Sequence, residues 1–201
     1  MYKRQGLHIP IIRIGRGSSK FFSNLVRSYG NNYDIVQVVA KGLKINLAVW
    51  VIYQLSNDFY IDGIYVNWGL HNISLSFFVY TKEKPVPIQR FVSDDNQYYI
   101  KVGKNSDEET LHRLINKQEQ SYLIAAGSSC FTICQLILYA FSMGFVPAKI
   151  EVIETLDFNG NKKAGLKVFI YRALPLYDEH LYSVPQDGVP ETEMSQVLQE
   201  S

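Results

Sequence analysis

Hydrophobic and polar positions follow the same order of patterns twice along the chain. Each copy opens with a short β-branched run that ends near a glycine, and a stretch with apolar residues at helical spacing follows it. A second apolar run, a second helical stretch and two further runs around a turn complete each copy. An internal repeat decides the architecture before single residues are considered. The pattern therefore predicts an α+β chain of two tandem β-α-β-α-β-β units.

The first copy carries clear start and stop signals. Ser18 or Ser19 is suited to cap the first helix, and Gly30–Asn32 is suited to end it. The second helix is apolar both around Val49 and around Trp50, so it needs two packing partners, such as its own sheet and a second domain. The predicted strands are Pro10–Gly15, Asp34–Ala40, Ile61–Trp68 and Ile73–Tyr80, and the second helix covers Lys44–Ser56.

The second copy repeats this order. A capping box at Ser106–Glu109 starts its first helix, and Asn159-Gly160 is a strong hairpin signal. We expect its second helix to pack on the second helix of the first copy, so that the two copies form an intrachain pseudo-dimer. The predicted strands are Tyr98–Gly103, Tyr122–Ala126, Ala148–Leu156 and Ala164–Arg172, and the second helix covers Cys130–Met143.

The two cysteines, Cys130 and Cys134, are predicted to be core residues. Their spacing of four places them on one face of a helix. Aligning the glycines that precede the second helices sets the cysteines over Ile45 and Val49, which are core positions of the first copy. We favour packing over redox or metal chemistry, because a buried free cysteine behaves as a small hydrophobe.

Length and composition set the domain organisation. At 47% hydrophobic and 19% charged residues, the 201-residue chain has the composition of a soluble globular protein. The longest apolar run, Phe131–Phe145, is too short to cross a membrane. We expect an intracellular protein, in the nucleus or cytoplasm, and a mitochondrial location stays open. The predicted parts are a first domain at residues 8–82, a linker at 83–96, a second domain at 97–174 and an acidic, disordered tail at 175–201.

The net charge of +1 hides an asymmetry between the copies. Residues 1–89 hold ten Lys/Arg and four acids, a net +6, whereas residues 90–201 hold ten Lys/Arg and fifteen acids, a net −5. This polarity indicates that the first copy is the one that touches a polyanion. The alternative interpretation is ordinary solvated surface charge.

Two short motifs mark the first copy. Ile14–Arg16 (Ile-Gly-Arg) ends the first predicted strand, and Ala40–Ile45 (Ala-Lys-Gly-Leu-Lys-Ile) leads into the second helix. With the order of elements over roughly residues 10–82, these motifs resemble the Alba family of small nucleic-acid-binding proteins. The second copy, roughly residues 97–173, resembles the family in order and hydrophobic pattern but only weakly in motif, and is identified as a degenerate copy.

The resemblance implies both a fold and a function. The family fold is β-α-β-α-β-β, and it usually dimerises through the second helix and the neighbouring strands. Its members bind DNA or RNA, and relatives serve as paired subunits of RNase P and RNase MRP. The resemblance therefore implies that the second copy is a built-in dimer partner for the first.

Two departures from the family pattern bear on the site. Family members often carry two adjacent lysines after the first-strand glycine, whereas here a glycine follows Arg16 and Lys20 comes a helical turn later. The second copy has Ser128 and Ser129 where the first has a leucine and a lysine. We therefore expect the second copy to bind phosphate weakly or not at all at its helix start, and to act as a scaffold.

The predicted nucleic-acid site combines cations with free helix N–H groups. Ser18 and Ser19 precede a helix whose first N–H groups attract phosphate, and Arg16 lies just before them. Lys41 and Lys44 stand at the start of the other helix. We expect the fold to bring these two helix starts to one side of the first copy, facing one nucleic-acid backbone.

Other candidates come from the hairpins and from the second copy. Trp68, at the tip of the first hairpin, is a candidate to stack on an unpaired base, with core or interface packing as an equal alternative. For His71 in the same turn, a purely structural role is favoured. The complete candidate set is Arg13, Arg16, Ser18, Ser19, Lys20, Lys41, Gly42, Lys44, Trp68, Lys104, Lys162 and Lys163.

No sequence pattern indicates catalysis. The histidines His8, His71, His112 and His180 have no cysteine or carboxylate at metal-ligand spacing, and no nucleophile-elbow or phosphate-loop motif occurs. We expect no enzymatic activity, no cofactor, no metal and no membrane partner. Two hypotheses follow: a protein that binds RNA, favoured over DNA, through the first copy, or a structural subunit of an assembly such as a ribonucleoprotein that uses the fold for protein contacts.

Overall fold

The computed structural model describes residues 9–68, 72–93, 98–115, 121–156 and 159–172. The fold is α+β, with two four-stranded mixed sheets whose strand orders are β1-β2-β4-β3 (sheet A) and β5-β6-β8-β7 (sheet B). In each sheet the first two strands run parallel and the other neighbours antiparallel. The strands are β1 (Ile11–Ile14), β2 (Ile35–Lys41), β3 (Tyr60–Trp68), β4 (Ile73–Tyr80), β5 (Tyr98–Lys101), β6 (Ser121–Ala126), β7 (Phe145–Leu156) and β8 (Lys162–Arg172).

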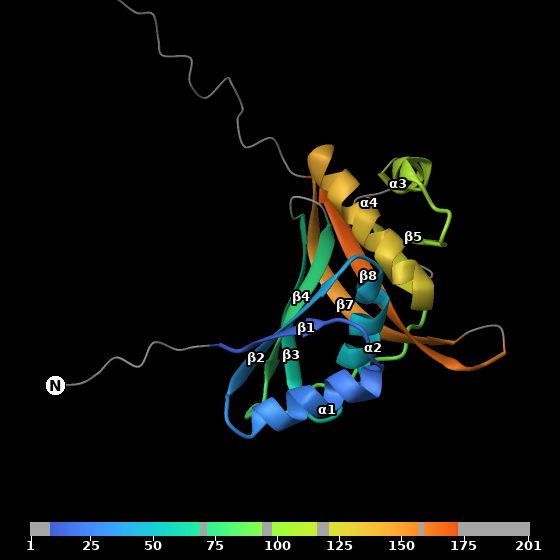
Figure 1. Ribbon diagram of the computed structural model, residues 1–201. Helices are drawn as coiled ribbons and strands as arrows, with labels where there is room; N and C mark the ends of the chain where they lie inside the picture. The colour runs from blue at the N-terminus through green and yellow to red at the C-terminus, as the bar shows by residue number, and fades with distance from the viewer. Residues whose placement is uncertain (1–8, 69–71, 94–97, 116–120, 157–158, 173–201) are drawn as a thin grey trace, which may run out of the picture.

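Four α-helices accompany the sheets in the described residues (Figure 1). Sheet A with α1 (Ser19–Gly30) and α2 (Ile45–Leu55) is called the first half below, and sheet B with α3 (Glu108–Ile115) and α4 (Cys130–Ser142) the second half. The Ser18 hydroxyl caps α1 by accepting a 3.1 Å hydrogen bond from the Phe21 N–H, which confirms the predicted cap. A 3₁₀ turn precedes α2 at residues 42–44 and α4 at residues 127–129, so the second helices begin in the same way.

The predicted elements are confirmed in order and type, with shifted ends in the second half. The strand predicted to reach Gly103 ends at Lys101, and the Gly103 N–H donates to the Ser106 hydroxyl in the turn toward α3. The strand predicted from Ala148 begins at Phe145 and carries an irregularity between Pro147 and Lys149. Proline is tolerated there because β7 is an edge strand that loses no obligatory ladder bond.

One hydrophobic core runs through both halves. Its fully buried members include Ile45 and Val49 of α2 and, at the equivalent positions of α4, Cys130 and Cys134, all with 0% exposure. Burial raises the pKa of the Cys130 thiol to about 12 and also raises that of Cys134. The cysteines are therefore apolar core residues, as predicted, and both thiols are free.

The halves pack on each other through their second helices. Helix α2 contacts α4, β7 and β8, while α4 contacts β3 and β4, so each helix lies against the sheet of the other half (Figure 1). The Asn46 side chain accepts a 2.9 Å hydrogen bond from the Phe131 N–H in the first turn of α4. The Tyr53 hydroxyl of α2 donates to the Glu154 carboxylate of β7.

The segment predicted as a linker, residues 83–96, is partly built into sheet B. The Phe91 N–H donates to the Glu154 carbonyl at 2.8 Å, and the Glu154 N–H donates to the Gln89 carbonyl at 3.1 Å. Arg90 thus forms a parallel bridge with Glu154 at the outer edge of β7. This pairing covers a stretch of an edge strand that would otherwise expose its hydrogen-bonding groups.

Several predicted features lie outside the described residues. They are the acidic tail at 175–201, the tip of the first hairpin with His71, and residues 1–8 and 94–97. None of the helices in the described part of the chain is long and apolar enough to cross a membrane.

Candidate nucleic-acid interface

The parallel pairing of β1 and β2 brings the two predicted motifs of the first half together. Ile14 is the register partner of Ala40, so Gly15 and Arg16 leave the sheet beside Lys41. Both strands end at the same edge because they run in parallel. The Arg16 and Lys41 side chains are exposed there.

Residues Lys41–Lys44 form what we call the lysine turn. Gly42 has a φ of 55°, a left-handed conformation that glycine adopts without strain, and it allows the strand to bend directly into the 3₁₀ turn. Lys41 and Lys44 are exposed on either side of the bend. Within the described ranges, no salt bridge involves Arg16, Lys41 or Lys44, so their charge is directed at solvent.

Residues Ala126–Ser129 form the equivalent serine turn of the second half. Gly127 has a φ of 56°, within one degree of Gly42, and α4 follows after the same number of residues. The turn itself carries no cation, but two lysines come from neighbouring elements. Lys104 is exposed shortly after β5, and a methyl group added at Gly127 would lie 3.9 Å from Cδ of Lys163 on β8.

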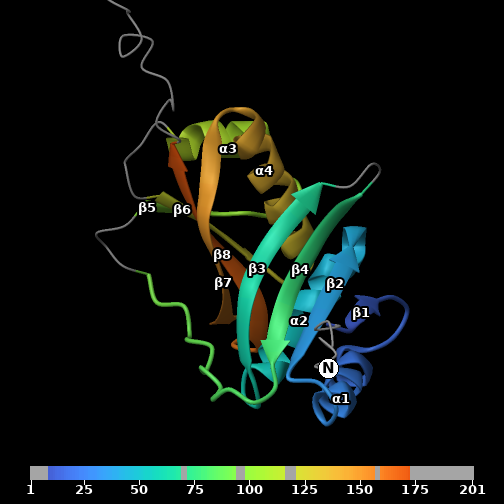
Figure 2. The ribbon, with the colours of Figure 1, turned by 90° about the vertical axis from the view of Figure 1, so that its left-hand side faces the viewer.

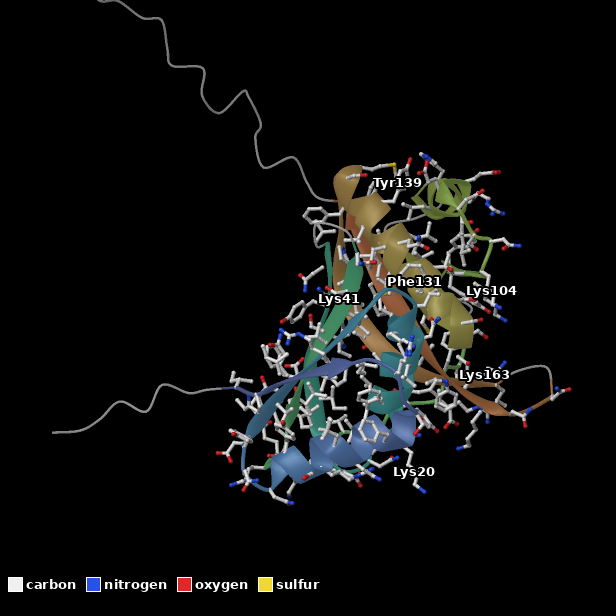
Figure 3. The ribbon with its side chains drawn as sticks, in the orientation of Figure 1. Lys20, Lys41, Lys104, Phe131, Tyr139 and Lys163 are labelled. Atoms are coloured by element: carbon white, nitrogen blue, oxygen red, sulfur yellow. The ribbon has the colours of Figure 1, made fainter. Side chains whose placement is uncertain are left out.

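The lysine turn and the serine turn lie close together because α2 and α4 start side by side. The hydrogen bond from the Phe131 N–H to Asn46 joins the second residues of the two helices. Each turn also contacts the helix of the other half. Figure 3 accordingly shows Phe131 between Lys41 and Lys104, so the cations of both halves flank one junction.

The serines before α1 are already engaged within the protein. The Ser18 hydroxyl caps the helix, and the Ser19 hydroxyl accepts a 3.0 Å hydrogen bond from the Gln54 amide of α2. Lys20 is exposed but lies on α1 at some distance from Lys41 in Figure 3. The structure thus does not gather Lys20 with the lysine turn, because the first turn of α1 leads away from the end of β1.

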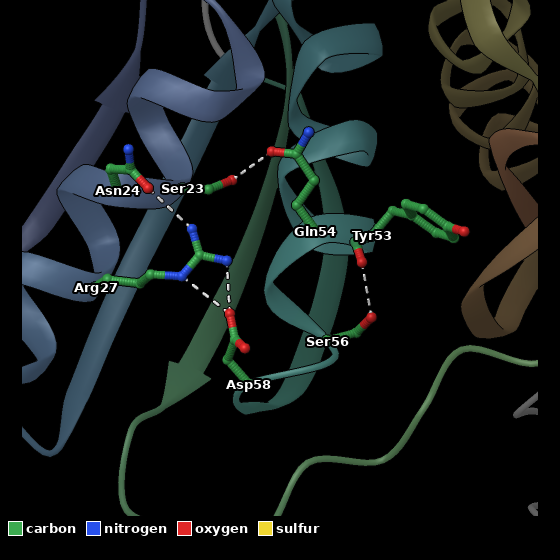
Figure 4. Close-up of polar contacts among 7 residues, drawn as sticks. All are labelled: Ser23, Asn24, Arg27, Tyr53, Gln54, Ser56 and Asp58. Carbon is green, nitrogen blue, oxygen red and sulfur yellow. Dashed lines mark hydrogen bonds and ion pairs between the residues drawn. The ribbon is translucent and has the colours of Figure 1, made fainter.

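A polar network fixes α1 against α2 and occupies a further cation (Figure 4). Arg27 donates to the Asp58 carboxylate from Nε at 2.9 Å and from Nη2 at 2.5 Å, and to the Asn24 side chain at 3.0 Å. The Ser23 hydroxyl donates to the Gln54 side chain at 2.9 Å. Arg27 is therefore a structural residue of the first half and not part of the exposed basic surface.

The remaining candidates separate by location. Arg13 is exposed on β1, and Lys162 is exposed but forms a 3.1 Å ion pair with Glu154. Trp68 ends β3, and its side chain lies outside the described set. Lys162 must therefore leave Glu154 to bind a phosphate.

Sequence reasoning missed two residues of this region. Leu43, at the tip of the lysine turn, is 72% exposed between two lysines, which places an apolar side chain in the basic surface. Asn46 accepts the hydrogen bond that joins the halves. Its polar side chain in a helix that is apolar on two sides was the sequence feature that could have indicated this contact.

The comparisons with known proteins found no match. No family model matches the sequence, no curated protein matches it, and no solved structure matches the fold.

Proposed function

We propose that this chain binds nucleic acid, RNA in preference to DNA, through a surface formed by the lysine turn, Arg16 and the lysines beside the serine turn. The proposal includes the architecture that the sequence suggests: two tandem Alba-like domains that pack as an intrachain pseudo-dimer. The second domain serves as the built-in partner of the first. No catalytic activity and no cofactor form part of the proposal.

The observation that carries the proposal is the register of β1 with β2. It sets Arg16 beside Lys41, and the bend at Gly42 adds Lys44, without an acid paired to any of the three in the described residues. Cations that converge from separate backbone segments, with helix N–H groups nearby, suit the spaced phosphates of a nucleic-acid backbone.

The element order supports the Alba-like interpretation. Both halves follow β-α-β-α-β-β, which is the order that the resemblance implies. Gly42 of the Ala40–Ile45 motif takes the left-handed conformation, which explains why a glycine occupies that position of the motif. The packing of α2 on α4 agrees with dimerisation through the second helix.

The second half enters the proposal through Lys104 and Lys163. The sequence predicted weak or no phosphate binding at its helix start, because serines replace the cations of the first copy. Lys163 lies against Gly127, and Lys104 follows β5, the strand that runs parallel to β6. The second half thus has cations beside its serine turn that come from other elements. We therefore extend the proposed surface across the junction of the halves.

The test is the salt dependence of binding by the double variant Lys41→Ala/Lys44→Ala. Binding to a 20-nucleotide RNA should weaken about tenfold or more near 0.1 M salt. The slope of log K against log salt should flatten by roughly one to two units. On a single strand each phosphate contact contributes about 0.7 to the steepness of this slope, because it releases a counterion.

The matched control is Lys82→Ala/Lys84→Ala. It removes two positive charges from exposed positions after β4, one of them on Lys82, which is ion-paired with Asp34 at 3.0 Å. The segment lies outside the proposed surface, so the slope should change little. A folded lysine-turn variant with unchanged affinity and slope would contradict the proposal. The alternative function, a structural subunit of a ribonucleoprotein, would then lead.

A further inference from the structure

The outer face of sheet A, on the side away from the helices, carries aromatic and basic side chains. Val36 and Val38 of β2 are fully buried toward the helices, so Gln37 between them points outward. By the same alternation, Phe77 and Val79 point inward and Phe78 outward. Figure 2 shows β3 and β4 toward the viewer, with no helix in front of them.

The outward side chains form connected aromatic pairs across β3 and β4. The Tyr65 and Phe78 rings lie 6.2 Å apart at 41°, and the Tyr60 and Tyr80 rings lie 5.6 Å apart at 45°. The Gln37 amide donates to the Tyr65 hydroxyl at 3.2 Å, which fixes that ring. All four rings are half-buried, so part of each is accessible.

The equivalent face of sheet B already holds an aromatic side chain from an extended segment. The Phe91 ring lies 5.5 Å from Tyr99 and 6.3 Å from Tyr122, in edge-to-face geometry. Tyr122 is only 1% exposed as a result of this and its other packing. This face of the fold therefore accepts a planar group delivered by an extended chain.

The strand registers place the two faces in correspondence. Val38 pairs with Phe77 in sheet A, and Leu123 pairs with Val168 in sheet B, so Phe78 corresponds to Phe169. Where Phe91 covers sheet B, no described segment is seen in front of sheet A (Figure 2). We call the Tyr65–Phe78 and Tyr60–Tyr80 pairs the platform, and within the described part of the chain no segment covers it as Phe91 covers sheet B.

The charges beside this platform favour a polyanion over an apolar peptide. Arg13 is exposed at an outward position of β1, and Lys41 at an outward position of β2 leads into the lysine turn. One acid, Asp62 of β3, is the register partner of Phe78 on the same face and accepts a hydrogen bond from Tyr60, so negative charge lies on the β3 side of the aromatic pairs. The aromatic pairs are therefore flanked on the β1–β2 side by cations that continue into the basic surface.

We propose that the outer face of sheet A binds unpaired bases of a single-stranded nucleic acid. Tyr65 and Phe78 stack on bases, while Arg13, at the opposite edge of the sheet from Tyr65, contacts a phosphate further along the nucleic-acid strand. Stacking on aromatic rings tolerates any base and requires single strands, because paired bases are hidden in a duplex. This inference rests on the proposed function and specifies that the bound nucleic acid is single-stranded.

The experiment compares two probes of equal length and charge: a fluorescent 12-nucleotide uridine RNA and its abasic analogue, which keeps the phosphates and lacks the bases. The wild-type chain should bind the uridine strand about tenfold more tightly or better. The double variant Tyr65→Leu/Phe78→Leu keeps apolar bulk but not the rings, so it should lose that preference and still bind the abasic strand as wild type does. Phe141→Leu, which removes a 64% exposed ring on α4, is the control and should change neither affinity.

The outcomes separate this inference from the proposed function. Equal wild-type affinity for both strands overturns the stacking inference and leaves the phosphate-binding proposal intact. Failure to bind either strand contradicts both. Photocrosslinking of wild-type protein to a bromouridine strand needs no variant: crosslinks mapped to β3 and β4 support the inference, and crosslinks confined to other elements overturn it.

Discussion

Gly42 and Gly127 begin equivalent turns in the two halves, with φ values of 55° and 56°, but different elements supply the cations around them. In the first half the cations belong to the turn itself, as Lys41 and Lys44. In the second half the turn carries serines, Lys104 comes from the loop after β5, and Lys163 comes from β8. The comparison teaches that backbone geometry, rather than a local lysine motif, defines where a basic surface can form in this fold.

The strand position beside each turn differs most sharply between the halves. Lys41 pairs with Ser74, and at the equivalent place Ala126 pairs with Gly165. A methyl group on Gly165 would lie 2.5 Å from the Ala125 carbonyl oxygen, a distance that ordinary packing does not allow. The second half is therefore packed more tightly next to its turn than the first.

Gly165→Ala should give the largest effect, a loss of about 3 kcal/mol in the free energy of unfolding, because backbone must move to admit the methyl group. Ser74→Ala is the matched control and should cost about 1 kcal/mol or less, since it removes only a long hydrogen bond of 3.4 Å to the Asn67 carbonyl. Urea titration of both variants measures the difference. Equal losses would show that the two turns are packed alike.

Ser128→Leu/Ser129→Lys copies Leu43 and Lys44 of the lysine turn into the second half and should have an intermediate effect. An added cation beside Lys104 and Lys163 should strengthen RNA binding by on the order of fivefold near 0.1 M salt, which corresponds to about 1 kcal/mol. The salt slope should steepen by about 0.7. The control Ser128→Leu alone should leave the slope unchanged. No gain from the double variant would place the serine turn outside the binding surface.

Glu154→Gln should have the smallest effect, which appears in how the free energy of unfolding depends on pH. The hydrogen bond from Tyr53, together with Lys162, lowers the pKa of Glu154 below its ordinary value of 4.5. Because the folded-state pKa is the lower one, the carboxylate stabilises the fold above about pH 4.5, and this contribution is lost as the pH falls through the folded-state value. Between pH 6 and pH 3 the wild type should lose more stability in urea than Glu154→Gln, and parallel losses would contradict this.

Local signals in the sequence predicted most of the fold. The Ser18 cap, the order of the strands and the burial of Cys130 and Cys134 follow from hydrogen-bonding groups and apolar spacing within single segments. Such signals need no knowledge of the distant chain. They also located the lysine turn, because its glycine and lysines are adjacent in sequence.

What the sequence did not reveal depends on contacts between distant segments. The approach of Lys163 to Gly127 depends on the register of β6 with β8. The hydrogen bond from Phe91 to Glu154 depends on β7 being at the edge of sheet B, beside the segment that holds Phe91. The direction in which α1 carries Lys20 away from Lys41 likewise depends on the path of the chain after β1. These features are set by tertiary packing, which propensity and spacing do not encode.

The hydrogen bond between Asn46 and Phe131 also bears on which partner each half selects. Both residues are the second of their helix, so the bond joins corresponding positions of the repeat. Two copies of the second half would bring phenylalanine opposite phenylalanine and offer no side-chain acceptor to either N–H. The mixed pair is thus favoured over self-association of the second half, and the covalent connection holds its stoichiometry at one to one at any protein concentration.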